Sequence, residues 1–102
     1  MDISKLMEQA QKMQQELGKM QDELKATVYL GKAGGSEGVT IRMNGDYEVE
    51  EVIISDELFA MNDKEMLQDL LLIAFNDAAE NAAADREAKL GSATQGISLP
   101  GF

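Results

Sequence analysis

The feature that most constrains this chain is a narrow apolar seam between Ile3 and Leu24. Apolar residues occupy every a and d position of a heptad repeat here, and Gln, Lys, Glu and Asp fill the other faces. This spacing is typical of a helix that pairs along one edge, and it is narrower than the stripe of an ordinary core helix. Such a helix is about 33 Å long and needs a partner, which is another helix of the chain, a second copy or a bound ligand. The seam consists of Ile3, Leu6, Ala10, Met13, Leu17, Met20 and Leu24.

Three short strands follow the seam. We expect them at residues 27–30, 39–43 and 47–54, with a glycine-rich loop after the first and an Asn44-Gly45 hairpin turn after the second. In the third strand we expect one face to carry Tyr47, Val49 and Ile53, and the other face to carry Val52 and Ile54. An apolar strand of this kind is covered on both sides or sits centrally in a larger sheet.

A second long helix is predicted from Asp63 to about Leu90, with a cap at Asn62-Asp63 and with Gly91 as its stop. Its first half is apolar nearly all round, which a surface helix does not need. Burial on more than one side explains this composition, and a dimer interface is the simplest source of it. The residues expected at that interface are Leu67, Leu70, Leu71, Phe75 and Ala78.

These elements predict one α+β domain of the order α-β-β-β-α, over residues 1–102. It divides into a helical arm (1–25), a three-stranded antiparallel meander (26–55), a helical region (56–91) and an irregular tail (92–102). The end of the tail, Leu99 to Phe102, is expected to dock on an apolar surface. The chain contains neither an apolar run that could span a membrane nor an apolar leader typical of a secretion signal.

Composition narrows the function. The chain has no cysteine and no histidine, and it shows no nucleophile or carboxylate pair in a recognisable catalytic setting, so we expect neither an enzyme nor a cofactor. Its net charge is −10, which by itself disfavours nucleic acids and anionic membranes as partners. The charge is uneven, because the first 27 residues hold four lysines against five acidic residues, whereas residues 56–102 hold three basic against nine acidic residues.

Lysines recur at heptad spacing along the first helix. Lys5, Lys12 and Lys19 share position c and form a line that could follow a phosphate backbone. Lys25 lies on another side of the helix and is a weaker candidate for DNA binding. The alternative interpretation is that these lysines pair with acidic residues of the same helix, such as Glu8 and Glu16 beside Lys12.

Other charged residues have simpler explanations. We expect Arg42 to pair across the sheet with Glu48 or Glu50. Arg86 and Lys89 near the end of the second helix suit its dipole. The acidic cluster of Glu48, Glu50 and Glu51 is better explained by a solvated strand face than by a metal site, so no metal ligand is assigned.

The chain also resembles a known family along its whole length. The resemblance rests on the joint spacing of several short motifs and on no single one of them. They are Leu6-Met7, Ala10-Gln11-Lys12-Met13-Gln14, Gly34-Gly35, Val39-Thr40-Ile41, Asn44-Gly45, Phe75-Asn76-Asp77-Ala78, Gly91-Ser92 and Leu99-Pro100-Gly101-Phe102. In these motifs and their order the chain is similar to the YbaB/EbfC family of bacterial nucleoid-associated proteins.

The resemblance implies a homodimer with a shared core of strands and last helices, from which the first helices project like the arms of tweezers. It implies binding to double-stranded DNA with little sequence preference, nucleoid organisation or control of gene expression, and a cytoplasmic, nucleoid-associated location. The alternative function is that of a protein–protein adaptor whose arms capture a helical partner, such as a replication or recombination protein.

Overall fold

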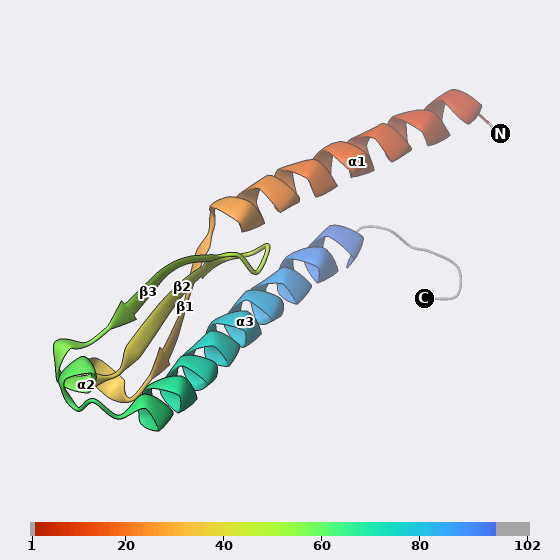
Figure 1. Ribbon diagram of the computed structural model, residues 1–102. Coiled ribbons are helices and arrows are strands. Elements are labelled where there is room, and N and C mark those ends of the chain that lie inside the picture. Colours follow the sequence, from red (N-terminus) through yellow and green to blue (C-terminus); the bar gives the residue numbers. More distant parts are fainter. Residues whose placement is uncertain (1, 96–102) are drawn as a thin grey trace.

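A computed structural model describes residues 2–95, with side chains placed as far as Gly91. Its elements confirm the expected order α-β-β-β-α, with one short extra helix between the sheet and the last long helix (Figure 1). They are α1 (Ile3–Ala26), β1 (Val28–Ala33), the 3-10 turn η1 (Gly35–Glu37), β2 (Val39–Asn44), β3 (Val49–Ile54), α2 (Asp56–Ala60) and α3 (Lys64–Gln95). The expected docking of Leu99–Phe102 falls outside the described residues.

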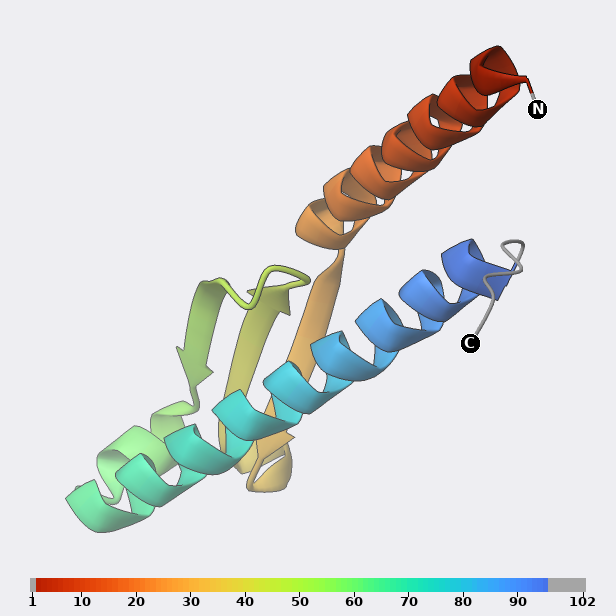
Figure 2. The ribbon, with the colours of Figure 1, turned by 90° about the vertical axis from the view of Figure 1, so that its right-hand side faces the viewer.

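The helix α1 projects from one end of the sheet, and we call it the arm. Asp2 caps it, because its Oδ1 accepts a hydrogen bond from the Ser4 amide at 3.0 Å. The helix ends where Thr27 adopts an extended backbone and leads into β1. Two perpendicular views show the arm reaching well beyond the sheet (Figures 1 and 2), and the molecule measures 69 × 25 × 17 Å.

The three strands form an antiparallel sheet in the order β1-β2-β3, so β2 is central and β3 is an edge strand. The register pairs Val39 with Ile54, Ile41 with Val52, and Met43 with Val49. A bulge between Arg42 and Met43 shifts the last of these pairs. Val49 therefore shares a face with Val52 and Ile54, and the expectation that it shares a face with Ile53 was wrong.

The helix α3 packs across β1 and β2 on one face of the sheet (Figure 2). Val39, Ile41 and Met43 of β2 form one core cluster with Ala74 and Ala78 of α3, and Ala82, one turn further along α3, is fully buried as well. Gly31 of β1 faces Ala74 and Ala78, and a Cβ atom on Gly31 would lie 2.0 Å from the Ala74 carbonyl oxygen. Small residues on both elements thus bring the helix backbone directly against the strand.

Three other boundaries differ from expectation. β1 continues through Lys32 to Ala33, because these two residues pair with Thr40 and Val39 of β2. The Asn44-Gly45 hairpin forms, but β3 begins only at Val49. The positive φ of the turn belongs to Tyr47 at 63°, not to Gly45. Helix α3 runs past Gly91 to Gln95, because one glycine costs a helix only about 1 kcal/mol and the preceding alanines favour it.

Candidate nucleic-acid interface

The candidate interface starts from the lysines of the arm. Lys5, Lys12, Lys19 and Lys25 all have exposed side chains. Residues seven apart on a helix differ by only about 20° in direction, so the first three form a nearly straight line. At 1.5 Å per residue this line is about 21 Å long, which matches about six base pairs of duplex. Lys25 does not continue the line, because it follows Lys19 by six residues and points to another side of the helix.

The arm lysines are not engaged in ion pairs in the part of the chain that the structure describes. The pairs within 4.0 Å there join Arg42 to Glu51, Arg86 to Asp46 and Lys89 to Asp85. The intrahelical pairs considered for Lys12 are therefore not formed. A shallow hollow of about 240 Å³ on the arm is lined by Lys5, Glu8, Gln9 and Lys12. The lysine ammonium groups are available to an anionic ligand, with glutamates nearby that weaken the local field.

The apolar seam of the arm is buried at its C-terminal end and becomes more exposed toward its N-terminal end. Leu24 is 2% exposed, whereas Met13 is 38%, Leu6 is 51% and Ile3 is 71% exposed. The body of the molecule therefore buries the last turn of the arm and partly covers Leu17 and Met20. The seam from Ile3 to Met13 is open in the single chain.

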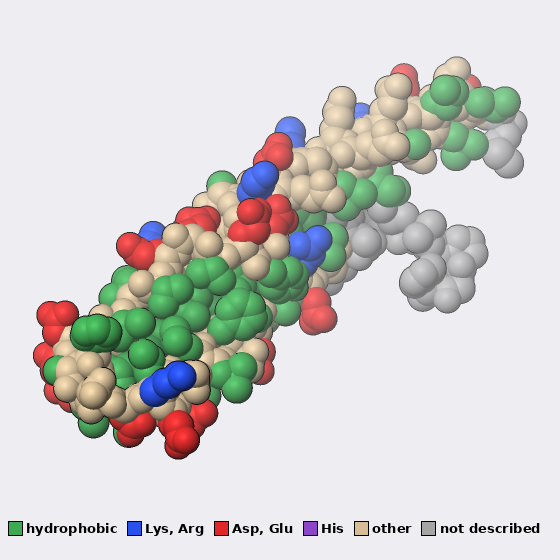
Figure 3. Space-filling model, viewed as in Figure 1, with side chains coloured by type: hydrophobic (Ala, Val, Ile, Leu, Met, Phe, Trp, Pro, Cys, Tyr) green, Lys and Arg blue, Asp and Glu red, His purple; other side chains and the backbone are tan. Residues whose placement is uncertain are grey.

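A second open surface lies between β3 and the first half of α3. The helix covers β1 and β2 and leaves β3 bare, so Val49 is 41% exposed and Val52 is 48% exposed. On the flank of α3 that faces β3, Phe75 is 40% exposed and Leu72 is 61% exposed. We call these four residues the open apolar surface. Figure 3 shows hydrophobic side chains gathered in this region of the molecule.

The five residues expected at a dimer interface differ in how far they are exposed. Ala78 is fully buried against the chain's own sheet, and Leu67, Leu70 and Leu71 are partly buried against the same core. Among the five, Phe75 alone is exposed and belongs to the open apolar surface. Sequence periodicity located the apolar half of α3, but it could not separate the face that packs on the sheet from the face that remains open.

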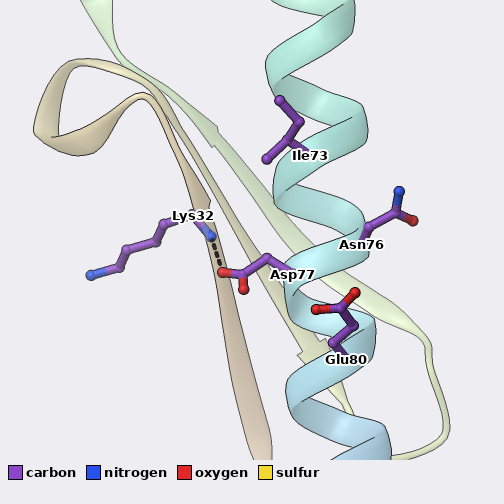
Figure 4. Close-up of a pocket in the computed structure, with 5 residues that line it drawn as sticks. All are labelled: Lys32, Ile73, Asn76, Asp77 and Glu80. Atoms are coloured by element: carbon purple, nitrogen blue, oxygen red, sulfur yellow. Dashed lines mark hydrogen bonds between the residues drawn. The ribbon is translucent and has the colours of Figure 1, made fainter.

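A hollow of about 350 Å³ beside the edge of β1 combines charged side chains without forming a reaction centre (Figure 4). Its lining residues are Lys32, Ile73, Asn76, Asp77 and Glu80. The Asp77 carboxylate accepts a hydrogen bond from the backbone amide of Lys32 at 3.0 Å, and the Lys32 ammonium group points away from the helix. Asn81 donates to the Leu30 carbonyl at 2.8 Å. These side chains satisfy the strand's outer edge, which is a structural task.

One charge network, formed by Tyr29, Asp85 and Lys89, was not anticipated from the sequence. The Tyr29 hydroxyl donates a hydrogen bond to Asp85, which also pairs with Lys89 at 3.1 Å. Burial, reinforced by Asp85, raises the pKa of Tyr29 to about 12. The hydrogen bonds from Tyr29 and Lys89 lower the pKa of Asp85. Lys89 is thus held by a specific carboxylate, and the helix dipole alone does not account for it.

Arginine positions were also misjudged. Arg86 reaches the Asn44-Gly45 hairpin, where its Nη1 donates to the Gly45 carbonyl at 3.1 Å. Arg42 pairs with Glu51 instead of Glu48 or Glu50, because the bulge beside Met43 places Glu51 directly opposite it. Among residues 2–95, no group of three or more acidic side chains is arranged to hold a metal ion. No helix in that part is both long enough and apolar enough to cross a bilayer.

Comparison with known proteins adds independent information. Residues 1–97 match the YbaB/EbfC DNA-binding family. A nucleoid-associated protein of Chloroflexus aurantiacus is 44% identical over 97 residues, which cover 95% of this chain and 96% of that protein. A nucleoid-associated protein of Xylella fastidiosa strain Temecula1 is 43% identical over 99 residues, covering 97% and 91% of the two chains.

A solved structure is similar as well. The crystal structure of an uncharacterized protein from Helicobacter pylori superposes with a TM-score of 0.78 at 29% sequence identity, covering 90% of this chain and 96% of the other. Sequence and fold therefore agree over nearly the full length. The chain belongs to the YbaB/EbfC DNA-binding family.

Proposed function

We propose that this chain is a homodimeric, nucleoid-associated protein that binds double-stranded DNA with little sequence preference through the lysine line of its arm. The observation that carries the proposal is that Lys5, Lys12 and Lys19 are exposed on a projecting helix and have no ion-pair partner among the described residues. Family membership and the names of the bacterial relatives support DNA as the ligand and the nucleoid as the location.

The negative net charge does not prevent this binding. A dimer carries −20, twice the −10 of one chain, but most of the excess acid lies in the second half of the sequence. Exposed charges separated by more than a Debye length, about 8 Å at physiological ionic strength, are largely screened. Arms that project from the body keep their distal lysines beyond that distance. The local attraction is then set by the arm, whose net charge is close to zero, and binding is weak and sensitive to salt.

Dimerisation rests on the open apolar surface. Val49, Val52, Leu72 and Phe75 are each at least 40% exposed, which is a high exposure for four large apolar side chains in one region. β3 is also an edge strand, so a second copy could extend the sheet or cover this face. Sedimentation of Val52→Asp against Thr40→Asp tests this point, because Thr40 lies on the opposite face of the sheet. Val52→Asp should yield monomers, and unchanged dimers would exclude this surface as the interface.

The binding mechanism is tested by fluorescence anisotropy of a labelled mixed-sequence duplex at about 20 and about 150 mM salt. Three phosphate contacts on each of the dimer's two arms give a slope of log affinity against log salt near −5.4, or a loss of about 5 × 10⁴-fold between the two conditions. Each alanine substitution in the line removes one lysine from each arm and should reduce this slope by about 1.8, and Lys25→Ala should have a smaller effect.

Lys32→Ala and Lys64→Ala are matched controls, because both residues are exposed and each substitution removes the same charge elsewhere on the chain. They should leave the slope unchanged. Equal losses of affinity for arm and control lysines would show that net charge, and not the lysine line, governs binding.

A protein–protein adaptor is the second candidate function. It is favoured by the open part of the seam, where Ile3, Leu6 and Met13 are exposed. Apolar side chains such as these do not bind DNA phosphates, but they can pack against a helical partner. Leu6→Gln and Met13→Gln should then abolish capture of a helical partner while DNA binding persists. Loss of DNA binding in these variants, with partner capture intact, would reject the adaptor function.

A further inference from the structure

The arm meets the body only through its C-terminal part, where it contacts α3 and β2. Within α1 the buried residue is Leu24, in the last turn, and the chain becomes extended at Thr27. Thr27 is the only residue between the arm and β1, and its amide and hydroxyl donate to the Leu24 and Glu23 carbonyls of the arm itself, so these bonds do not tie the arm to the body. Something else must hold the arm in the orientation seen in Figure 1.

The hairpin turn at residues 44–48 contacts the end of the arm and can hold it. Its Gly45 amide donates a hydrogen bond to the Leu24 carbonyl at 2.7 Å, which satisfies one of the last carbonyl groups of the arm. The fit is close, because a Cβ atom on residue 45 would lie 2.5 Å from that carbonyl oxygen and 2.7 Å from the Leu24 Cβ. Glycine is therefore required here by contact with the arm.

The same residue is held through its carbonyl group by α3. The Gly45 carbonyl accepts a hydrogen bond from Arg86, which also lies 3.9 Å from the Asp46 carboxylate and 6.0 Å from the centre of the Tyr47 ring. The turn is shaped by Asn44, which is 5% exposed and accepts hydrogen bonds from the amides of Asp46 and Glu48 at 2.9 and 3.0 Å. The single residue Gly45 thus links α3 to the end of α1.

We propose that this link, from Arg86 through Gly45 to Leu24, fixes the direction of the arm, and that Gly45 and Arg86 are positioning residues for DNA binding. The inference rests on the proposed function of the lysine line. Lys5 lies about 28 Å along the helix from Leu24, so a swing of about 20° at the junction moves it by about 10 Å. That displacement exceeds the Debye length of about 8 Å, so it separates a lysine from its phosphate.

The experiment measures arm direction and DNA binding separately. The chain has no cysteine, so cysteines at Gln9 on the arm and Asp69 on α3 accept spin labels without background. Labelled chains are diluted into unlabelled protein, and the distance distribution is recorded by pulsed electron resonance. Duplex affinity is measured by anisotropy at about 150 mM salt, where the Debye length is about 8 Å, and folding is checked by circular dichroism.

Gly45→Ala changes no charge, and it should shift or broaden the distance distribution and weaken DNA binding at least fivefold. Gly18→Ala, in the middle of the arm, is its matched control, because a Cβ atom at position 18 meets nothing within 4 Å. The distance distribution and the DNA affinity of this control should equal those of the unmodified protein. Arg86→Gln should act like Gly45→Ala, and Arg86→Lys, which keeps a donor and the charge, should restore part of both readouts. If Gly45→Ala fails to fold, the Arg86 pair carries the test.

The outcomes separate the two proposals. An unchanged distance distribution in folded Gly45→Ala and Arg86→Gln overturns the positioning role. A changed distribution with unchanged DNA affinity also overturns it, because direction would then not matter to binding. If the unmodified protein binds no duplex, the DNA-binding function fails, and the distance data still decide whether the link fixes the arm.

Discussion

Gly31→Ala is the substitution for which we work out the expected loss of folding stability in detail. A Cβ at this position lies 2.0 Å from the Ala74 carbonyl oxygen, 2.4 Å from the Ala78 amide nitrogen and 2.7 Å from the Ala78 Cβ. Optimal non-bonded contacts between carbon atoms are about 3.5 Å or longer, so α3 must move by more than about 1 Å. Two of the three atoms are backbone, and no side-chain rotation relieves the contact.

The expected cost follows from this geometry. Overpacking in a core costs about 1–3 kcal/mol and more when the backbone must move, so we expect at least about 3 kcal/mol. For a chain of this size, 1 kcal/mol corresponds to about 4–8 °C, so Tm should fall by at least about 12 °C. Moving the helix also opens the layer beneath Ala74 and Ala78, both of which are fully buried.

Thermal unfolding followed by circular dichroism measures this effect, at one protein concentration because a dimer's Tm depends on it. Gly18→Ala is the control for the same chemical change. It lies in a helix with free space around it and should stabilise the protein by about 0.5–1 kcal/mol. A fall of less than about 4 °C for Gly31→Ala would refute the argument that the strand and the helix are in backbone contact.

Three further predictions follow from named contacts. The pKa of Tyr29 is raised to about 12, so the stability that its neutral hydroxyl contributes should be complete below pH 10 and lost between about pH 10 and 12. Urea midpoints measured across that range should show this loss, and Tyr29→Phe should remove it. Asp77→Ala should speed hydrogen exchange of the Lys32 amide, which it caps at 3.0 Å, without changing the amides of β1 that face β2. Asp63→Ala should lower stability by about 1 kcal/mol, because Asp63 caps α3 by accepting from the Met66 amide, and an unchanged urea midpoint would exclude that role.

The sequence predicted the local elements of this protein well. Heptad spacing from Ile3 to Leu24 predicted the arm, the pattern of Val39–Met43 predicted β2, and the predicted cap at Asn62-Asp63 forms through Asp63. Each of these signals depends on residues within a turn or two of one another, where helical and strand periodicity are directly visible. The exposed lysines follow for the same reason, because position on a helix is a local property.

The candidate site was predictable only in part. The lysine line could be named from spacing, but the availability of Lys12 could not, because competing glutamates lay within reach along the helix. The interface residues were predicted as one set, although Ala78 is enclosed by the sheet and Phe75 is open. The difference depends on which face of α3 the sheet covers, and the apolar composition of the helix is the same on both faces.

The tertiary structure alone decided what joins distant parts of the chain. The bulge beside Met43 moved Val49 to the core-side face and brought Glu51 to Arg42. Gly31 meets the alanines of α3, and Arg86 meets Gly45 across 41 positions of sequence. These contacts depend on strand register and on the distance between packed backbones. Both are set by how the whole chain fills its core, so no short stretch of sequence contains them.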